Sequence, residues 1–174
     1  FARPDFPRRG YWLARLALQR FHILHPEVEI HFYGSKVEGL AFPATQHGRL
    51  TPVELNELYN RCVAGLVLSF TNVSLVPEEM LAAGTIPVVN DSAHSKMVLE
   101  NDHVIWATAT PSGLAEALSS AVTRPDRQET ARAASESVRK FGWRRAQEDI
   151  LRIIENEVYG READSRDLRP AHRP

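Results

Sequence analysis

The sequence has little of several features that would mark a specialised protein. Its 174 residues contain a single cysteine, Cys62, which excludes an internal disulfide and offers no second thiolate for a metal site. No apolar run approaches the roughly 20 residues of a membrane-spanning helix. The formal net charge is −1, and there is no basic stripe of the kind that binds nucleic acid. These absences predict a protein of the reducing cytoplasm with no nucleic-acid partner.

Motifs of several common enzyme classes are also missing. There is no glycine-rich phosphate loop of the dinucleotide or nucleotide-triphosphate kind, no Cys-x-x-Cys and no legible Ser/His/Asp order. Kinases, NAD-dependent dehydrogenases and hydrolases are therefore disfavoured. His22 and His25 have the spacing of a helical metal pair, but no acidic or cysteine partner flanks them. A structural role is favoured for both, because a helix C-terminus attracts histidine.

What is present is an alternation of strands and helices. Apolar residues make up 43% of the chain and charged residues 25%, which is typical of a globular protein. We expect an α/β domain with a mostly parallel sheet over residues 1–159, with its first strand truncated at residues 1–3, and a disordered tail over 160–174. The predicted strands are 28–33, 45–47, 63–68, 86–89 and 103–107, and helices are predicted to begin near Gly10, Thr51, Pro77, Ser92, Thr110, Pro125 and Trp143. The buried face of the first helix is expected to hold Leu13, Leu16, Ala17, Phe21 and Leu24.

The stretch 63–89 is the centre of this pattern. It consists of a buried strand, a loop of small polar residues at 69–74, a short helix and a second buried strand after Gly84. Continuous apolar strands joined through a helix are typical of a parallel sheet that is covered on both faces. Ligands of such sheets bind at the carboxyl ends of the strands, so the 69–74 loop is expected to border a ligand crevice.

Charged residues fall at the same predicted edge. Arg3, Arg9 and Lys36 follow strands or begin a helix, where cations suit a diphosphate, although each of them alone could equally be solvated surface. Glu78 and Glu79 lie in the first turn of a helix and point about 100° apart. They are therefore a poor acid/base pair, and one that reached the crevice would hold hydroxyl groups. His47 also borders the predicted crevice.

The same residues carry a family resemblance. The segments FARPDFPRRG, HFYGSK, HGRLTPVELNELYNRC, LVLSFTNVSLVPEEMLAAGTIPVV and KFGW occur in this order. Together they resemble the C-terminal domain of GT-B glycosyltransferases of the family-4-like group, nearest to bacterial rhamnosyltransferases that use a dTDP sugar. The resemblance spans about residues 1–158 and implies a Rossmann-like three-layer domain, the C-terminal half of a GT-B fold, that binds a nucleotide-diphosphate sugar.

The resemblance also implies roles for particular residues. Arg3 and Arg9 match the positions that bind the donor diphosphate, and Glu79 matches the glutamate that binds the ribose hydroxyls. Ser74 and Leu75 match the loop whose backbone N–H groups meet the phosphates. The remaining matches border the base or add a nearby cation: Gly34, Gly48 and Arg49 for the base, and Lys36 for the cation.

One position departs from the family pattern. Many members carry a glutamate eight residues before the late one, beside the reacting sugar of retaining enzymes, and here that position is Thr71. The substitution fits an inverting enzyme or one adapted to a deoxysugar. The resemblance implies no metal and no cofactor, since cationic side chains and helix dipoles stabilise the leaving diphosphate.

The sequence thus predicts the donor-binding domain of a rhamnosyltransferase in cell-surface polysaccharide synthesis. The catalytic base and the site for a glycan or lipid-linked acceptor are expected on a separate N-terminal domain, so this chain alone should bind donor and transfer no sugar. The parent enzyme is expected at the inner face of the cell membrane. The alternatives are a non-catalytic nucleotide-binding regulatory module, a GT-B sugar-nucleotide epimerase, and a protein-interaction domain whose arginines are only surface.

Overall fold

The structure is a computed structural model that describes residues 1–139 and 142–159. The chain divides into two compact units, the first from Phe1 to Val138 and the second from Arg139 onward. The described part of the second unit is a single helix, α7 (Trp143–Tyr159). Each unit is considered by itself.

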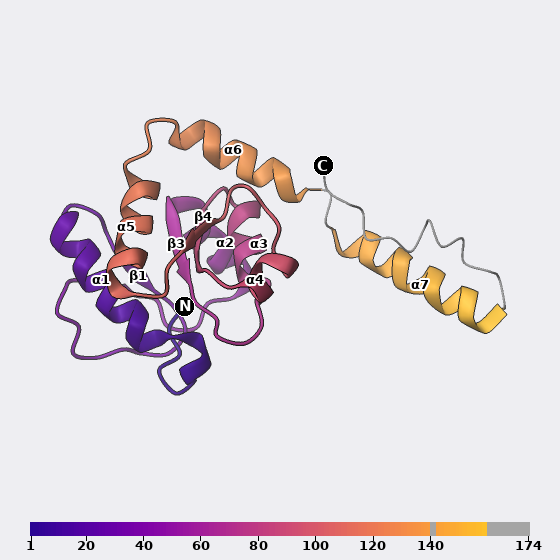
Figure 1. Cartoon of the computed structure of the whole chain (residues 1–174), viewed down its shortest axis with the longest axis horizontal. Coiled ribbons are helices and arrows are strands. Elements are labelled where there is room, and N and C mark those ends of the chain that lie inside the picture. The colour runs from indigo at the N-terminus through magenta and orange to yellow at the C-terminus, as the bar shows by residue number, and fades with distance from the viewer. Residues whose placement is uncertain (140–141, 160–174) are drawn as a thin grey trace. The chain divides into compact units, whose positions relative to one another are not determined.

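The first unit alternates strands and helices along the chain, as the sequence predicts (Figure 1). After a short 3₁₀ helix at Pro7–Arg9, its helices are α1 (Tyr11–Leu24), α2 (Pro52–Arg61), α3 (Val76–Ala82), α4 (Ala93–Val98), α5 (Pro111–Val122) and α6 (Arg127–Val138). Its strands are β1 (His31–Phe32), β2 (Thr45–Gln46), β3 (Ala64–Val67), β4 (Ile86–Asn90) and β5 (Ile105–Ala107).

All strand pairs in the described residues are parallel. β1 pairs with β2, with His31 opposite Thr45, and a second sheet has the order β3-β4-β5. In the second sheet Leu66 lies opposite Val88, and Val88 lies opposite Ile105. Ala2 adds an isolated parallel bridge to Gly34, just beyond the end of β1. Within each sheet the carboxyl ends of the strands therefore share one edge, as parallel pairing requires.

Helices cover both faces of the strands. Figure 1 shows α1 and α5 on one side and α2 and α3 on the other. One apolar cluster joins α1 and α5 to the sheet through Val88, and a second joins α3 and α6 to it through Val89. Because neighbouring residues of β4 point to opposite faces, a fully buried strand of five residues serves both clusters.

The predicted face of α1 is only partly right. Ala17 and Phe21 are buried as expected, but Leu16 and Leu24 are exposed. The buried stripe begins at Tyr11, which the prediction left out, and the spacing from Tyr11 to Phe21 turns Leu16 to the opposite side of the helix. Tyrosine is a weaker signal of burial than leucine because it carries a hydroxyl group.

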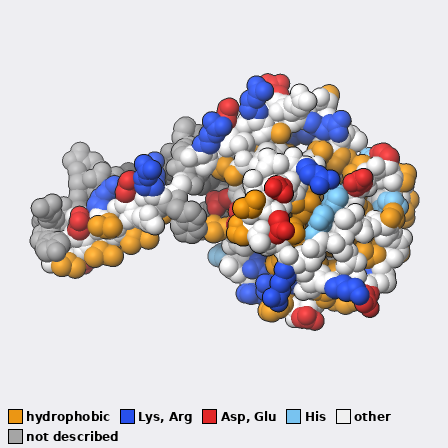
Figure 2. Space-filling view, turned by 180° about the vertical axis from the view of Figure 1, so that it is seen from behind, with side chains coloured by type: hydrophobic (Ala, Val, Ile, Leu, Met, Phe, Trp, Pro, Cys, Tyr) orange, Lys and Arg blue, Asp and Glu red, His pale blue; other side chains and the backbone are white. Residues whose placement is uncertain are grey.

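The second unit has a pronounced apolar stripe. Ile150, Ile153, Ile154 and Val158 lie along one side of α7 and are exposed, and Figure 2 shows apolar side chains gathered along that helix. The disordered tail predicted for residues 160–174 lies outside the described residues. Among the residues that the structure describes, no helix is long and apolar enough to cross a membrane.

Candidate functional site

The loop after β3 is fastened to the end of β4 by a buried asparagine. The Asn90 side-chain oxygen accepts the Ser69 N–H at 2.8 Å, and its side-chain nitrogen donates to the Ser69 carbonyl at 2.9 Å. The Ser69 hydroxyl then donates to the Asn72 carbonyl at 2.6 Å. Ser69 and Asn90 are both buried, so these bonds are shielded from competition by water. The loop therefore leaves the sheet in a fixed direction.

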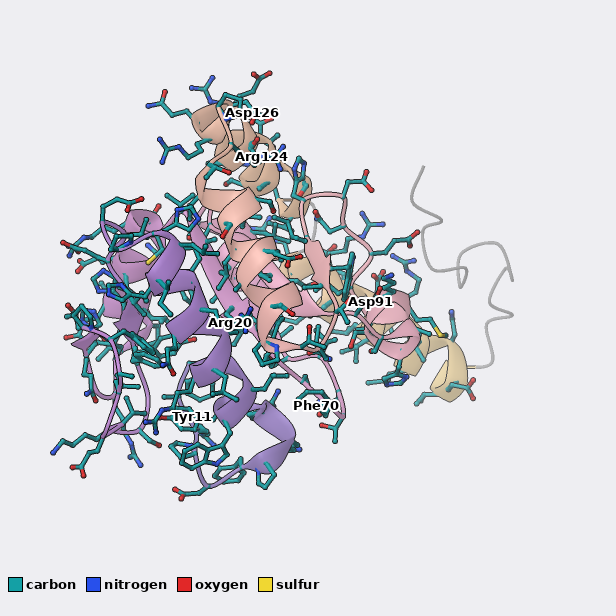
Figure 3. All side chains as sticks on the ribbon, turned by 60° about the vertical axis from the view of Figure 1, so that its left-hand side comes forward. Tyr11, Arg20, Phe70, Asp91, Arg124 and Asp126 are labelled. Carbon is teal, nitrogen blue, oxygen red and sulfur yellow. The ribbon has the colours of Figure 1, made fainter. Side chains whose placement is uncertain are left out.

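The same loop packs against the start of α1. The Phe70 N–H donates to the Arg8 carbonyl at 2.9 Å, which places the loop beside the predicted diphosphate-binding Arg9. Figure 3 labels Phe70 of this loop and Tyr11 at the start of α1. Gly10 makes this approach possible, because a Cβ there would lie 2.8 Å from the Phe70 ring. Its φ of +61° is also one that other residues rarely adopt.

Beyond the end of β1, backbone hydrogen bonds join three segments that are far apart in the sequence. The Gly34 N–H donates to the Gly48 carbonyl at 2.7 Å, and the Ser35 N–H donates to the Ala2 carbonyl at 3.0 Å. Gly34 has a φ of +102°, and a Cβ there would lie 2.7 Å from the Ala2 carbonyl oxygen. The structure thus brings together two of the predicted glycines and the residue next to Arg3.

A tyrosine pair connects this part of the edge to α2 and α3. The hydroxyl groups of Tyr33 and Tyr59 are 2.6 Å apart, and Tyr33 stacks on Phe1 with ring centroids 5.2 Å apart. Burial raises the pKa of both tyrosines, and the Glu79 carboxylate adds to the rise through its negative charge. Glu79 therefore lies close enough to act electrostatically on the residue that precedes Gly34.

Arg3 lies above two aromatic rings at this edge. Its guanidinium carbon is 5.1 Å from the Phe1 ring centre and 5.2 Å from the Phe6 ring centre. These contacts orient the side chain while its charge remains exposed to solvent. Arg9 is partly buried at the end of the 3₁₀ helix, one residue before Gly10.

The other predicted residues lie in turns, and all of them except the half-buried Ser74 are exposed. Lys36 forms an ion pair with Glu38 at 3.1 Å, which is weak because both side chains are about four-fifths exposed. The Thr71 hydroxyl donates to the Asn72 side chain at 3.2 Å. Ser74 and Leu75 directly precede α3, and Leu75 is its N-cap residue without a side-chain cap bond. Arg49 follows Gly48 and is exposed.

The histidines have structural partners. His47 shares a 3.0 Å hydrogen bond with His31, whose other ring nitrogen is 3.4 Å from Glu29. His25 bonds to the Ser119 hydroxyl at 2.9 Å, which ties α1 to α5. Within residues 1–139 and 142–159, no group of three or more His, Cys, Asp or Glu is placed to hold a metal ion.

Sequence reasoning missed two parts of this edge. The Tyr33–Tyr59 pair was missed because the two residues are 26 apart in the sequence and no local pattern joins them. Asn90 was missed although the sequence carries a signal for it. A polar residue that ends an apolar run such as Ile86–Asn90 is expected to bond to the backbone of a neighbouring strand or loop.

Comparison with solved structures identifies the class of fold. A trehalose-phosphate synthase (UDP-forming) from Burkholderia xenovorans, in complex with glucose-6-phosphate, matches 85% of this chain with a TM-score of 0.68 and 16% identity. The synthase from Burkholderia multivorans matches 87% with a TM-score of 0.58 and 16% identity, and the GtfA/B complex matches 86% with a TM-score of 0.64 and 13% identity. The domain is Rossmann-like with a mostly parallel sheet, the C-terminal half of a GT-B fold, as predicted.

The family follows from the sequence match. The family described as "WsaF, C-terminal domain" matches residues 1–119, which is more than half of the chain, and the chain belongs to this family. No match was found among curated proteins. The chain spans 41% of the length of the two trehalose-phosphate synthases and 33% of the matched GtfA/B chain. Family and fold together support a glycosyltransferase domain.

Proposed function

We propose that this chain is the donor-binding domain of a glycosyltransferase that uses a nucleotide-diphosphate sugar. One observation carries the proposal: segments far apart in the sequence meet at the carboxyl end of β1, where Arg3 follows the Ala2–Gly34 bridge and the Tyr33 hydroxyl bonds to that of Tyr59. Glu79 of α3 adds its negative charge to the surroundings of this tyrosine pair. The edge thus combines a carboxylate for hydroxyl groups, a cation for phosphate and aromatic rings. These are the groups that a nucleoside diphosphate requires.

The proposed roles follow from chemistry. Arg3 and Arg9 bind the diphosphate and stabilise its negative charge as it leaves, together with backbone N–H groups of Ser74 and Leu75. Glu79 accepts hydrogen bonds from the ribose hydroxyls. Gly34, Gly48 and Arg49 border the base, and Lys36 adds positive charge nearby. The matched synthases are described as UDP-forming, which supports a nucleoside diphosphate as the group released.

The donor sugar is proposed to be rhamnose, carried by dTDP. The support is the sequence resemblance to dTDP-rhamnose-dependent enzymes and the uncharged Thr71, which places no carboxylate beside the sugar. The acceptor would be a glycan or a lipid-linked glycan of the cell envelope, bound by a separate domain that also supplies the base. The reaction proposed here needs neither a metal nor a cofactor, and it takes place in the cytoplasm at the inner face of the membrane.

Glu79→Gln tests the proposed role of the carboxylate. Because the amide is a weaker acceptor than a carboxylate, nucleoside-diphosphate affinity should fall roughly tenfold or more. Glu78→Gln is the matched control, since this neighbour points about 100° away on the same helix. Calorimetric titration of both variants and the unmodified chain with dTDP measures the effect. Equal affinity of the Glu79 and Glu78 variants would remove Glu79 from the site.

A further inference from the structure

The outer face of α1 carries a stripe of exposed apolar side chains. Trp12, Leu16 and Ile23 are 61%, 52% and 72% exposed. With about 100° of rotation per residue, the three lie within about 40° of one another and span about three turns of the helix. Ala17 and Phe21, on the opposite face, are buried in the core. α1 therefore presents a continuous apolar stripe to solvent, whereas exposed apolar residues are usually scattered singly over a protein surface.

Arginines flank the stripe on both sides. Around the helix, Arg15 lies about 60° from Trp12 on one side, and Arg20 lies about 40° from Leu16 on the other. The Arg15 guanidinium carbon is 5.7 Å from the Trp12 ring centre, and its Nη2 donates to the Gly39 carbonyl. Arg20 is exposed and is labelled in Figure 3. We name the surface formed by Trp12, Arg15, Leu16, Arg20 and Ile23 the α1 face.

The charge around the α1 face is mainly positive. Between Asp5 and Glu27 the sequence has four arginines and no acidic residue. Helix α5, which packs against α1, contains one acidic residue, Glu116. Glu38, in the loop beside α1, is paired with Lys36 at 3.1 Å. The α1 face therefore complements a partner that is negatively charged and also accepts apolar side chains.

The surface of an anionic bilayer has both properties. Its phosphates pair with arginine, and the boundary between its headgroups and acyl chains accepts large apolar side chains. Tryptophan is enriched at this depth because its ring is amphipathic. An arginine can bury its methylene groups there while its guanidinium stays at the phosphates. A helix of 14 residues such as α1 can lie in the plane of the bilayer with one face immersed.

Helix α7 also has an exposed apolar stripe, but its charges fit an anionic surface less well. It carries four acidic residues and three arginines, and Asp149 pairs with Arg152 at 3.2 Å. Helix α1 has two arginines and no acidic residue. Because each arginine near an anionic surface adds attraction and each acidic residue adds repulsion, charge favours α1 over α7.

We propose that the α1 face binds the surface of a lipid bilayer that contains anionic phospholipids. The helix lies in the plane of the bilayer, with the side chains of Trp12, Leu16 and Ile23 at the boundary between headgroups and acyl chains. Arg15 and Arg20 contact lipid phosphates. This inference goes beyond the proposed function, which places the reaction at the inner face of the membrane but names no surface that binds it.

Flotation of the 174-residue chain with vesicles tests the proposal. Phosphatidylcholine vesicles with roughly one-third phosphatidylglycerol provide the anionic bilayer, and pure phosphatidylcholine vesicles are the neutral comparison. The double variant Trp12→Gln, Ile23→Gln removes two apolar side chains of the stripe, and Arg20→Glu reverses a flanking charge. All three side chains are exposed, so the variants should keep the fold, which urea unfolding checks.

Matched controls make the same changes elsewhere. The double variant Val53→Gln, Met97→Gln removes exposed apolar side chains from α2 and α4, and Arg132→Glu reverses an exposed charge on α6. The double variant Ile150→Gln, Ile153→Gln does the same to the stripe of α7.

The unmodified chain should float with the anionic vesicles and not with the neutral ones, and it should be released as salt rises from about 0.1 M to about 1 M. Each of the two variants of the α1 face should lower vesicle affinity roughly tenfold or more. The controls should bind like the unmodified chain.

A second measurement locates Trp12 in the bilayer. The double variant Trp106→Phe, Trp143→Phe leaves Trp12 as the single tryptophan of the chain. Its fluorescence should be quenched by anionic vesicles whose acyl chains carry bromine, because the proposal places the ring at the acyl boundary. Binding without quenching would overturn that placement.

Other results would overturn the proposal as a whole. Absence of binding to anionic vesicles would remove the membrane as the partner, and equal losses in the controls would mean non-specific attraction. Loss of binding only in the α7 variant would place the membrane surface on that helix. Self-association of the unmodified chain that Trp12→Gln, Ile23→Gln abolishes would make a second copy the occupant. No nucleotide enters these measurements, so the α1 face and the donor site are tested separately.

Discussion

At the scale of single residues, the site depends on side chains that hold backbone in place. Asn90 is 3% exposed and satisfies both the N–H and the carbonyl of Ser69. A buried backbone group left without a partner costs about 1–3 kcal/mol. The asparagine therefore stabilises the fold and directs the loop that contributes Ser74 and Leu75 to the proposed phosphate site.

Asn90→Ala should lower the free energy of unfolding by at least about 2 kcal/mol, because two buried backbone groups lose their partners. Asn56→Ala is the matched control, since Asn56 is exposed on α2 and its loss should change stability by less than about 0.5 kcal/mol. Urea unfolding measures both. A loss at Asn90 no larger than that at Asn56 would mean that the loop is held by other contacts.

The sequence predicts local features of single residues better than contacts between residues that are far apart in the chain. Local rules explain the positive φ of Gly34 and Gly84, because a glycine after a strand or helix marks a turn. They could not predict that the Tyr33 and Tyr59 hydroxyls meet, because that contact depends on how β1 and α2 pack. The roles assigned to Arg3, Arg9, Lys36, Thr71 and Glu79 stay predictions.

At the scale of elements, hydrogen bonds in the first turn of helix α2 determine where that helix begins. The Thr51 hydroxyl accepts the Glu54 N–H at 3.4 Å, and the Glu54 carboxylate accepts the Thr51 N–H at 2.8 Å. This capping box is the one that the sequence Thr-Pro-Val-Glu favours, and it lies where the sequence predicts the start of a helix. It fixes the start of the helix that carries Tyr59 to the proposed site.

Thr51→Ala should destabilise the chain by about 1 kcal/mol at neutral pH, while Thr51→Ser should retain the cap. The Thr51 backbone N–H, and then its hydroxyl, lower the pKa of Glu54. Because the folded pKa is below the unfolded one, the contribution of the Glu54 carboxylate to the cap is fully present above about pH 5 and is lost as pH falls through the folded value. Urea unfolding across this range measures it. A difference between the Ala and Ser variants that persists unchanged at low pH would contradict the pairing.

Patterns of apolar residues predicted some elements well and others only in part. The central strands β3 and β4 were predicted within one or two residues, because continuous apolar runs bounded by Gly84 leave few other readings. The predicted buried face of α1 was partly wrong, because apolar residues lie all around that helix. Leu16 and Leu24 are exposed while Tyr11 is buried, and only packing against α5 and the sheet decides between them.

At the scale of the whole molecule, the proposed donor site lies at an edge where residues from several segments of the first unit meet. Arg3, Gly34, Gly48 and Glu79 come from four separate segments. Parallel pairing brings the first three together, and Glu79 comes from helix α3. The central claim is that this edge binds a nucleoside diphosphate. Arginines that were only solvated surface would give no such binding.

The most direct test is calorimetric titration of the 174-residue chain with dTDP, UDP and GDP at moderate salt, with thymidine as a control that lacks the diphosphate. The account predicts saturable one-to-one binding of dTDP, at least tenfold tighter than UDP or GDP, and much weaker binding of thymidine. Tighter binding of UDP or GDP would contradict the rhamnosyl donor and keep the diphosphate site. Absence of binding by all three diphosphates would contradict the donor-binding function of this chain.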